Sequence, residues 1–433
     1  MSSCLPDESA ARRNVNYLAT LDMIISLGFG LIMPLFPQYV KLLGGGAFEV
    51  GILFSSFVLT RALLATAFGN LSDKIGRKKL ILVGAFLYAL LAVLFTVPED
   101  WFGLIFVRGF QGVASAMVWP VSEALVIDSC SPRNRGASLG KVVMASNLGM
   151  VIGPFVGGAL YFTADKYLGF SEEASFKFPF YFTAVIALAG AVMVWARVVE
   201  MRPTNPSRPR LSFRELMRPE GMDKPGITNL RVLYANAVME GFAFASIGPL
   251  MAYYLPLRFG IDADLTAIVV GIAMGFGALV AYPSGRLSDR VGRKRLFVLG
   301  SVLSFAGIIL IPFGRTLWVV IIFMSMRSMA FQVASPALRA LQADTVPEAV
   351  RGKLIGMLES MANLGSVIGS PVGGILIDVY YGRDIGTPSP IDGTMIPFFV
   401  SGGLGLFTVC MVSLLVKERR VSQSAHNLID GGR

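Results

Sequence analysis

The sequence predicts an all-α integral membrane protein with twelve transmembrane helices in two six-helix bundles related by pseudo-two-fold symmetry. Three observations lead to this prediction. The 433 residues are 54% hydrophobic and only 15% charged, whereas about a quarter of the residues of a soluble domain are charged. Long apolar segments recur along nearly the whole chain. A charged motif between two of these segments is repeated in the second half of the chain.

Each apolar segment is long enough to cross a membrane as a helix. About 20 helical residues span a hydrocarbon core of about 30 Å. We count twelve such segments, whose ends can shift by about two to four residues. In chain order they are 16–40, 50–70, 80–98, 101–126, 140–162, 178–198, 230–256, 266–287, 296–313, 317–341, 353–378 and 393–416.

Basic residues gather on one side of the predicted membrane. The formal net charge is +10, and Arg and Lys are abundant in alternate connections between the apolar segments. Such a bias sets the orientation of a membrane protein, with the basic side in the cytoplasm. We therefore expect a multi-pass protein of the cell membrane with both termini cytoplasmic and no nucleic-acid partner. Only six basic residues outside the segments fall on the other side: Lys41, Lys166, Lys177, Arg258, Arg315 and Arg383.

A polar stretch rich in Pro and Arg divides the twelve segments into six and six. It covers 199–229 and has the composition of a linker. We expect an N-terminal six-helix bundle at 1–198, a cytoplasmic linker at 199–229, a C-terminal six-helix bundle at 230–416 and a cytoplasmic tail at 417–433.

The two halves are related in sequence at a shift of 216 residues, the difference between 69 and 285. The stretch "GNLSDKIGRKK" at 69–79 recurs as "GRLSDRVGRKR" at 285–295. Two six-helix halves in the same orientation are one repeat arrangement of secondary transporters, in which the substrate binds between the halves. The same shift relates Asp128 to Asp344, and Gly149, Gly153, Gly157 and Gly158 to Gly365, Gly369, Gly373 and Gly374.

The repeated stretch resembles the signature of the major facilitator superfamily, G-x-L-S-D-x-x-G-R-[KR]-[KR] after the second helix. The resemblance covers essentially the whole chain. "RGFQG" at 108–112 and "GMVIGPFVGG" at 149–158 resemble motifs in the fourth and fifth helices of its twelve-helix drug:proton antiporter branch. The second-half copy, "GSVIGSPVGG", departs from the pattern because Ser370 replaces the proline and Pro371 follows it.

The resemblance implies that the 69–79 turn is a cytoplasmic gate. In the family this turn latches the two halves together when the transporter is open outward. We expect Arg77 to pair with Asp128, and an ion pair present in one state biases a two-state equilibrium. The alternative is a solvated loop whose basic residues only set the orientation. The predicted gating residues are Gly69, Asp73, Gly76, Arg77, Asp128, Gly285, Asp289, Gly292, Arg293 and Asp344, with Arg293 expected to pair with Asp344.

Small residues recur every fourth position in the fifth and eleventh segments. Glycines at this spacing form one helix face on which a neighbouring helix can approach closely in lipid. A proline inside the fifth segment removes a backbone donor and can kink the helix. The predicted packing residues of this motif are Gly149, Gly153, Pro154, Gly157 and Gly158.

Ionisable residues inside the apolar segments are the predicted sites of substrate binding and proton coupling. Each is costly in the membrane interior and typically marks an ion or substrate path. A carboxylate there can bind either a proton or a substrate cation, which is the physical basis of antiport. The alternatives are a boundary charge for Asp22 and, for both Arg61 and Arg327, a simple ion pair with an acid. The predicted residues are Asp22, Arg108, Glu123, Glu240, Arg327 and Glu359.

The sequence as a whole favours a secondary active transporter that exports small amphipathic or cationic compounds by proton antiport and alternating access. We expect a monomer in the lipid bilayer, with protons and a small molecule as its partners. The alternatives are a sugar or metabolite transporter of the same fold, as exporter or symporter, and a non-transporting membrane sensor. An enzyme is disfavoured, because no catalytic constellation or phosphate-binding loop is present. The single histidine, His426, and three cysteines have no metal-ligand spacing, so we expect no metal and no cofactor.

Overall fold

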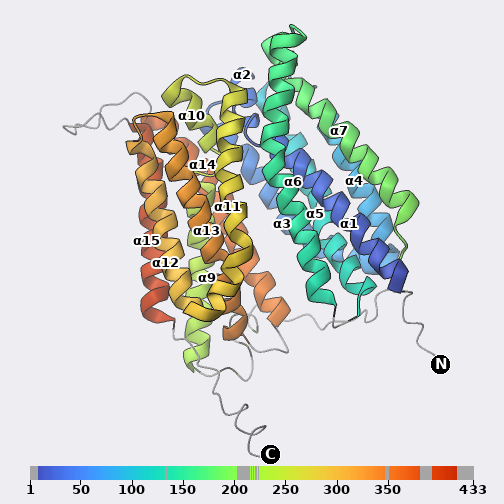
Figure 1. Cartoon of the computed structure of the whole chain (residues 1–433), viewed down its shortest axis with the longest axis vertical. Helices are drawn as coiled ribbons and strands as arrows, with labels where there is room; N and C mark the ends of the chain where they lie inside the picture. Colours follow the sequence, from blue (N-terminus) through green and yellow to red (C-terminus); the bar gives the residue numbers. More distant parts are fainter. Residues whose placement is uncertain are drawn as a thin grey trace, which may run out of the picture.

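The computed structural model describes residues 8–131, 134–201, 215, 217, 219, 222, 224–346, 351–380 and 393–416 (Figure 1). These residues are mostly helical and include no strand. Two short helices, α2 (Phe36–Leu42) and α10 (Met251–Phe259), accompany twelve helices of 18 residues or more in this part of the chain. The twelve are α1 (Glu8–Ile32), α3 (Ala47–Ile75), α4 (Arg77–Leu94), α5 (Trp101–Ser129), α6 (Arg135–Phe162), α7 (Glu172–Arg197), α9 (Lys224–Ala245), α11 (Ala263–Val291), α12 (Arg293–Leu310), α13 (Leu317–Thr345), α14 (Arg351–Tyr380) and α15 (Ile396–Leu415).

Each long helix corresponds to one predicted apolar segment. Ten of the twelve are long and apolar enough to cross a membrane by themselves, among the residues described. The other two are α4, which begins with three consecutive basic residues, and α9, which carries Lys224, Arg231 and Glu240. The predicted all-α fold with twelve membrane helices is therefore confirmed.

Two predicted segments are wrong in one respect, because each is broken near its end. The predicted segment 16–40 is divided between α1 and α2, and the predicted segment 230–256 between α9 and α10. Pro34 lies in the first break and Pro249 in the second. A proline has no backbone N–H to donate and restricts the residue before it, so a continuous helix is disfavoured at both places.

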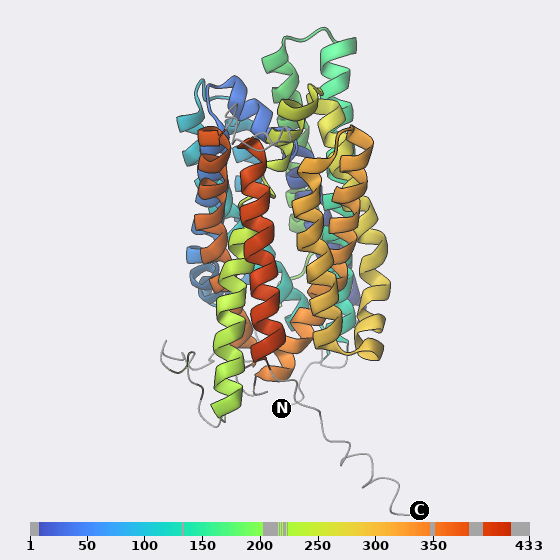
Figure 2. The same ribbon diagram turned by 90° about the vertical axis from the view of Figure 1, so that its left-hand side faces the viewer.

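The long helices form two bundles, α1 to α7 and α9 to α15 (Figure 1). In the first bundle α1 packs on α6 and α7, and α5 packs on α3 and α4. In the second, α9 packs on α14 and α15, and α13 packs on α11 and α12. Figure 2 shows α9 (lime) beside α15 (red). The predicted linker at 199–229 lies largely outside the described residues, and the tail at 417–433 lies wholly outside them, so these boundaries remain predictions.

The bundles have two ends, which we name by their residues. The basic face carries the start of α1 and the junctions between α3 and α4 and between α11 and α12, and the opposite face carries α2 and α10 (Figure 1). Between the bundles, α3 packs against α14 and α6 packs against α11. These two helix pairs connect the halves.

Candidate functional site

Ion pairs around Arg77 hold the turn at 69–79. Gly76, between α3 and α4, has a φ of 105°, a conformation that favours glycine. The Arg77 guanidinium contacts Asp73 of α3, with Nη2 3.1 Å from Oδ1, and Asp128 of α5, with Nε 2.5 Å from Oδ2. The predicted pairing of Arg77 with Asp128 is confirmed, and the gating role of these residues stays a prediction.

The repeated turn in the second half has a similar arrangement. Gly292 has a φ of 100° between α11 and α12, and the Arg293 side chain pairs with Asp344 of α13 as predicted. For Gly285 and Asp289 only the backbone, which lies within α11, is described. The two turns therefore share both the glycine and the arginine–aspartate pair.

A lysine next to each turn binds the carboxyl end of a bundle's last helix. Lys78 Nζ donates to the carbonyl oxygen of Trp195 in α7 at 2.9 Å. Lys294, at the equivalent position, donates to the carbonyl oxygen of Val416 after α15 at 2.6 Å. The last carbonyls of a helix lack intrahelical donors, and a cation there is also favoured by the helix dipole. These lysines therefore make structural contacts besides any effect on orientation.

Glu200 caps the start of α4 and was not recognised from the sequence. Its Oε1 accepts from the backbone N–H of Arg77 at 2.9 Å, and its Oε2 accepts from that of Lys78 at 3.0 Å. A carboxylate at a helix N-terminus is favoured by the unpaired N–H groups and the dipole. Helix-capping residues normally precede the helix directly, so a cap more than 120 residues away leaves no local signal.

The glycine face of α6 packs directly on α1. A Cβ atom at Gly149 would lie 2.2 Å from the carbonyl oxygen of Met23, and one at Gly157 would lie 2.3 Å from that of Leu31. The predicted backbone-to-backbone packing is therefore confirmed. The other members of this face are Gly153 and the buried Pro154, and Gly365, Gly369 and Gly373 place α14 on α9 in the same way.

Gly158 lies against the other bundle, unlike the rest of its motif. A Cβ atom there would lie 3.0 Å from the carbonyl oxygen of Asp264, in the first turn of α11. Its counterpart Gly374 faces the start of α3, where a Cβ atom would lie 2.3 Å from the carbonyl oxygen of Ala47. The two bundles thus meet near the opposite face through equivalent contacts.

A carboxylate joins the two bundles at the same face. Asp378 of α14 accepts the backbone N–H of Ala47 on Oδ1 at 3.1 Å and that of Phe48 on Oδ2 at 2.8 Å. It therefore caps the N-terminus of α3, where a negative charge is favoured. Further along the same pair of helices, Ser55 Oγ donates to the carbonyl oxygen of Val367 at 2.7 Å.

The same helices have open glycines toward the basic face. Cβ atoms at Gly136 and Gly140 of α6, or at Gly352 and Gly356 of α14, would meet no atom of the described chain within 4 Å. Close packing between the bundles is thus found near the opposite face, whereas these glycines near the basic face are open.

Three exposed charged side chains, two from the first bundle and one from the second, interact electrostatically with one another. Arg61 of α3 lies within electrostatic reach of Glu123 of α5 and Glu359 of α14. Glu123 and Glu359 also act on each other. The Arg61 Cζ atom lies 4.8 Å from the centre of the Trp119 ring, a distance at which a cation is attracted to an aromatic face. The alternative that Arg61 pairs with an acid therefore has an electrostatic basis in both bundles.

Asp22 and Arg339 extend this charged cluster. Asp22 is 2% exposed in α1, and its Oδ2 accepts from Ser122 Oγ at 3.3 Å, beside Glu123. The alternative that Asp22 is a boundary charge does not fit this burial. Arg339, at the position equivalent to Glu123 under the shift of 216, lies within electrostatic reach of Glu123.

Arg108 lies among aromatic rings. It is 4% exposed, and its Nη1 donates to Gln111 Oε1. No carboxylate of the described residues forms an ion pair with it. Its Cζ atom lies between 4.5 and 5.9 Å from the ring centres of Phe29, Phe36, Phe57 and Phe95.

The remaining predicted residues lie in the second bundle. Glu240 of α9 accepts from Asn236 Nδ2 at 3.1 Å. The Arg327 Cζ atom of α13 lies 5.8 Å from the ring centre of Phe244, one turn after Glu240 on α9. The structure thus brings Asp22, Glu123 and Glu359 together. Arg108 is linked to this cluster through aromatic rings, since Phe29 lies 6.4 Å from Trp119 between ring centres. Arg327 lies near Phe244 of the second bundle.

The sequence profile of the Major Facilitator Superfamily matches residues 18–231 and 233–431. The chain belongs to this superfamily. It is therefore a multi-pass membrane transport protein for a small-molecule substrate, and not an enzyme. The match covers both bundles and both copies of the repeated turn.

Among its relatives, the chain is 25% identical to an uncharacterised MFS-type transporter of Methanocaldococcus jannaschii, over 85% of this chain and 92% of that protein. It is 23% identical to the quinolone resistance protein NorA of Staphylococcus aureus, over 94% and 97% respectively. It is also 25% identical to multidrug resistance protein 2 of Bacillus subtilis, over 82% and 86%.

Solved structures show the same fold. A bacterial homologue of the human lysosomal transporter Spinster, inward-facing and unoccupied, superimposes with a TM-score of 0.76 at 15% identity, covering 96% of this chain and 98% of that one. A crystal structure of the nucleoside transporter NupG gives a TM-score of 0.71 at 14% identity, covering 94% and 100%. At these identities the likeness establishes the architecture alone.

Proposed function

We propose that this member of the superfamily is a proton-driven exporter of small amphipathic or cationic compounds. Its relatives include proteins named for quinolone and multidrug resistance, which favours efflux. The observation that carries the proposal is the charged cluster, where Glu123 and Glu359 come from different halves and both lie within electrostatic reach of Arg61.

The cluster can couple a proton to a substrate cation by competition. A carboxylate binds one or the other, so a cation that enters between Glu123 and Glu359 favours release of a proton from them. The Trp119 ring beside Arg61 supplies an aromatic surface for the apolar part of an amphipathic substrate. The buried Asp22, next to Ser122, is suited to hold a proton in the state without substrate.

Alternating access would exchange the contacts at the two faces. The contacts of Asp378, Gly158 and Gly374 near the opposite face would break, while the open glycines of α6 and α14 would come together near the basic face. We assign the basic face to the cytoplasmic side of the cell membrane, because the excess of Arg and Lys on this face follows the positive-inside rule. That the protein works as a monomer stays a prediction.

Transport by purified protein in proteoliposomes tests the proposal. The vesicles carry an imposed pH gradient, and the uptake of a fluorescent cationic dye is followed. We expect wild-type uptake of the dye to require a vesicle interior that is more acidic than the outside, because in antiport protons leave as the dye enters. We expect Glu123→Gln or Glu359→Gln to reduce gradient-driven uptake at least ten-fold, because each removes a proton site. The same assay is carried out with Asp22→Asn and Glu240→Gln, so that all four predicted acids of the membrane helices are tested.

Glu99→Gln is the matched control, since Glu99 is an exposed acid in the connection before α5, near the opposite face. It should transport at the wild-type rate. Uptake that is insensitive to the pH gradient, or that survives all four substitutions, would contradict proton-coupled export. Accumulation of dye along the proton gradient would instead identify a symporter. No transport of any probe, with dye binding retained, would favour the sensor alternative.

A further inference from the structure

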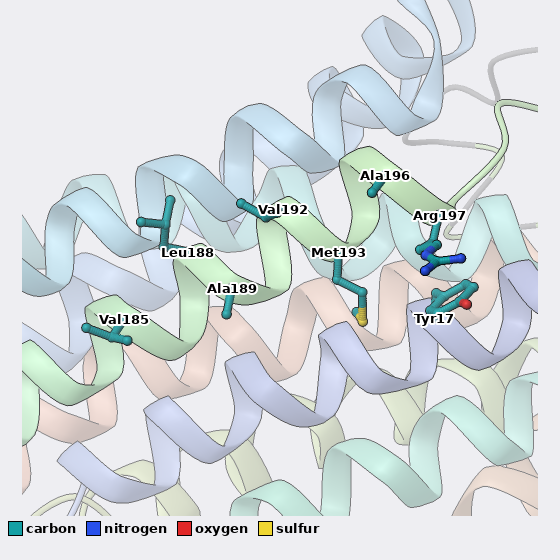
Figure 3. Close-up of a pocket in the computed structure, with 8 residues that line it drawn as sticks. All are labelled: Tyr17, Val185, Leu188, Ala189, Val192, Met193, Ala196 and Arg197. Carbon is teal, nitrogen blue, oxygen red and sulfur yellow. The ribbon is translucent and has the colours of Figure 1, made fainter.

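An apolar groove lies on the outer surface of the first bundle, between α1 and α7 (Figure 3). It has a volume of about 650 Å³. Val185, Val192 and Met193 of α7 line its length, while Arg197 and Tyr17 lie together at one end. The groove takes no part in the charged cluster or the gating turn, so transport as proposed above does not explain it.

The charged end of the groove lies at the basic face. Arg197 is the last residue of α7, and its side chain is exposed. No carboxylate of the described residues forms an ion pair with it. An arginine fork binds phosphate oxygens through parallel hydrogen bonds, and the Tyr17 hydroxyl beside it is a further donor. The groove therefore offers an anion site at its end and an apolar surface along the rest.

The groove has the length of one membrane leaflet. Val185 and Arg197 are twelve residues apart, which is about 18 Å along a helix at about 1.5 Å per residue. Half of the hydrocarbon core is about 15 Å thick. A lipid with its phosphate at Arg197 would thus lay one acyl chain along α7 as far as the membrane centre.

We propose that this groove binds one anionic phospholipid of the leaflet at the basic face. The phosphate pairs with Arg197 and Tyr17, and one acyl chain packs along Val185 and Val192. Basic residues that are unpaired at a membrane surface attract anionic lipids. The bound lipid would contact α7 at the helix end where Trp195 accepts from Lys78, so it would support the end of the bundle that holds the gating turn.

Lipid binding by the purified full-length protein tests the proposal. Native mass spectrometry gives the affinity for phosphatidylglycerol and, as the neutral comparison, phosphatidylcholine. We expect wild-type protein to retain one phosphatidylglycerol in preference to phosphatidylcholine. Arg197→Gln should weaken phosphatidylglycerol binding about five-fold, the typical effect of one basic residue on an anionic lipid. Its effect on phosphatidylcholine should be smaller.

Arg231→Gln is the matched control, because Arg231 is an exposed arginine near the start of α9 in the other bundle. It should leave both affinities unchanged. Ala189→Trp, which fills the apolar part of the groove, should weaken both lipids without removing the charge. The proposal is overturned if the two lipids bind equally to wild-type protein, or if Arg197→Gln and Arg231→Gln have the same effect.

Discussion

At Arg108 a guanidinium lies within 6 Å of the centres of four phenylalanine rings, and its hydrogen-bond partner is the neutral Gln111. The resemblance of "RGFQG" to a family motif predicted coupling or pairing in the central site for this residue. The aromatic cage comes from α1, α2, α3 and the residue after α4, so no local pattern in the sequence could reveal it. A buried, always-charged side chain in such a cage is stabilised by cation–π attraction.

The cage predicts that Arg108 cannot be replaced by lysine without loss of stability. A compact ammonium lacks the planar surface that stacks on several rings and the fork that reaches Gln111. We expect Arg108→Lys to lower the Tm of the detergent-purified protein by a few degrees, the effect of about 1 to 2 kcal/mol. Arg61→Lys is the control, because Arg61 is exposed and lies over one ring, and it should lower the Tm less. Equal shifts would show that the cage does not stabilise the charge.

The two acids on Arg77 should differ when each is removed. The Asp128 side chain is 9% exposed and that of Asp73 is 32% exposed. Breaking a largely buried pair leaves an uncompensated charge, whereas an exposed pair contributes about 0 to 1 kcal/mol. We expect Asp128→Asn to lower the Tm more than Asp73→Asn.

The same acids should affect the rate of conformational change. We expect both substitutions to slow dye transport several-fold while substrate binding is retained, as for a gate that lies outside the binding site. Binding measured by dye fluorescence separates the two effects. If Asp73→Asn transports at the wild-type rate, the gating hypothesis is wrong and the turn at 69–79 is a solvated loop.

At the level of elements, hydropathy predicted the long helices because each must be apolar over the thickness of a membrane. The glycine faces of α6 and α14 were predictable too, since a four-residue spacing of small residues already describes one face of a helix. The breaks after α1 and α9 were missed, although Pro34 and Pro249 mark them, because the flanking residues are as apolar as the helices. Cross-bundle contacts such as those of Asp378 depend on the tertiary arrangement, and the sequence pattern does not contain them.

Substitution by alanine should change the stability in opposite directions at two glycines of α6, one packed on α1 and one open. A Cβ atom at Gly153 would lie 2.6 Å from backbone atoms of Gly30 and Leu31, so Gly153→Ala must separate α1 from α6. We expect a large fall in Tm, or loss of folded protein. Gly140→Ala meets no atom of the described chain and gains up to about 1 kcal/mol of helix propensity. A Tm for Gly153→Ala at or above that of Gly140→Ala would contradict the close packing of α6 on α1.

At the level of the whole molecule, the two halves are equivalent in most contacts and differ in a few. Gly158 and Gly374 each face the start of a helix in the other bundle, and both copies of the repeated turn contain an arginine–aspartate pair. Asp378 has no such equivalent, because the shift of 216 relates it to Phe162. The contact between α3 and α14 near the opposite face therefore contains a charge-assisted cap that the contact between α6 and α11 lacks.

This asymmetry makes Asp378 the residue that should set the balance between the two access states. The carboxylate binds two N–H groups of α3 across the bundles, and those bonds must break before the opposite face can open. An amide is a weaker acceptor and loses the attraction of the helix dipole. We expect Asp378→Asn to favour the state closed at the basic face by about 1 to 2 kcal/mol, a factor of about 5 to 30 in the equilibrium.

Chemical labelling measures this shift. A single cysteine at Gly356→Cys, in a background without the native cysteines, lies at an open position near the basic face. Its rate of reaction with a water-soluble maleimide reports how often that face is open. We expect Asp378→Asn to slow labelling, and Gly374→Val, which forces α14 away from Ala47, to slow it as well. Glu99→Gln removes an exposed charge near the opposite face and should leave the rate unchanged. If Asp378→Asn labels as fast as wild-type protein, the cap on α3 does not hold the two bundles together.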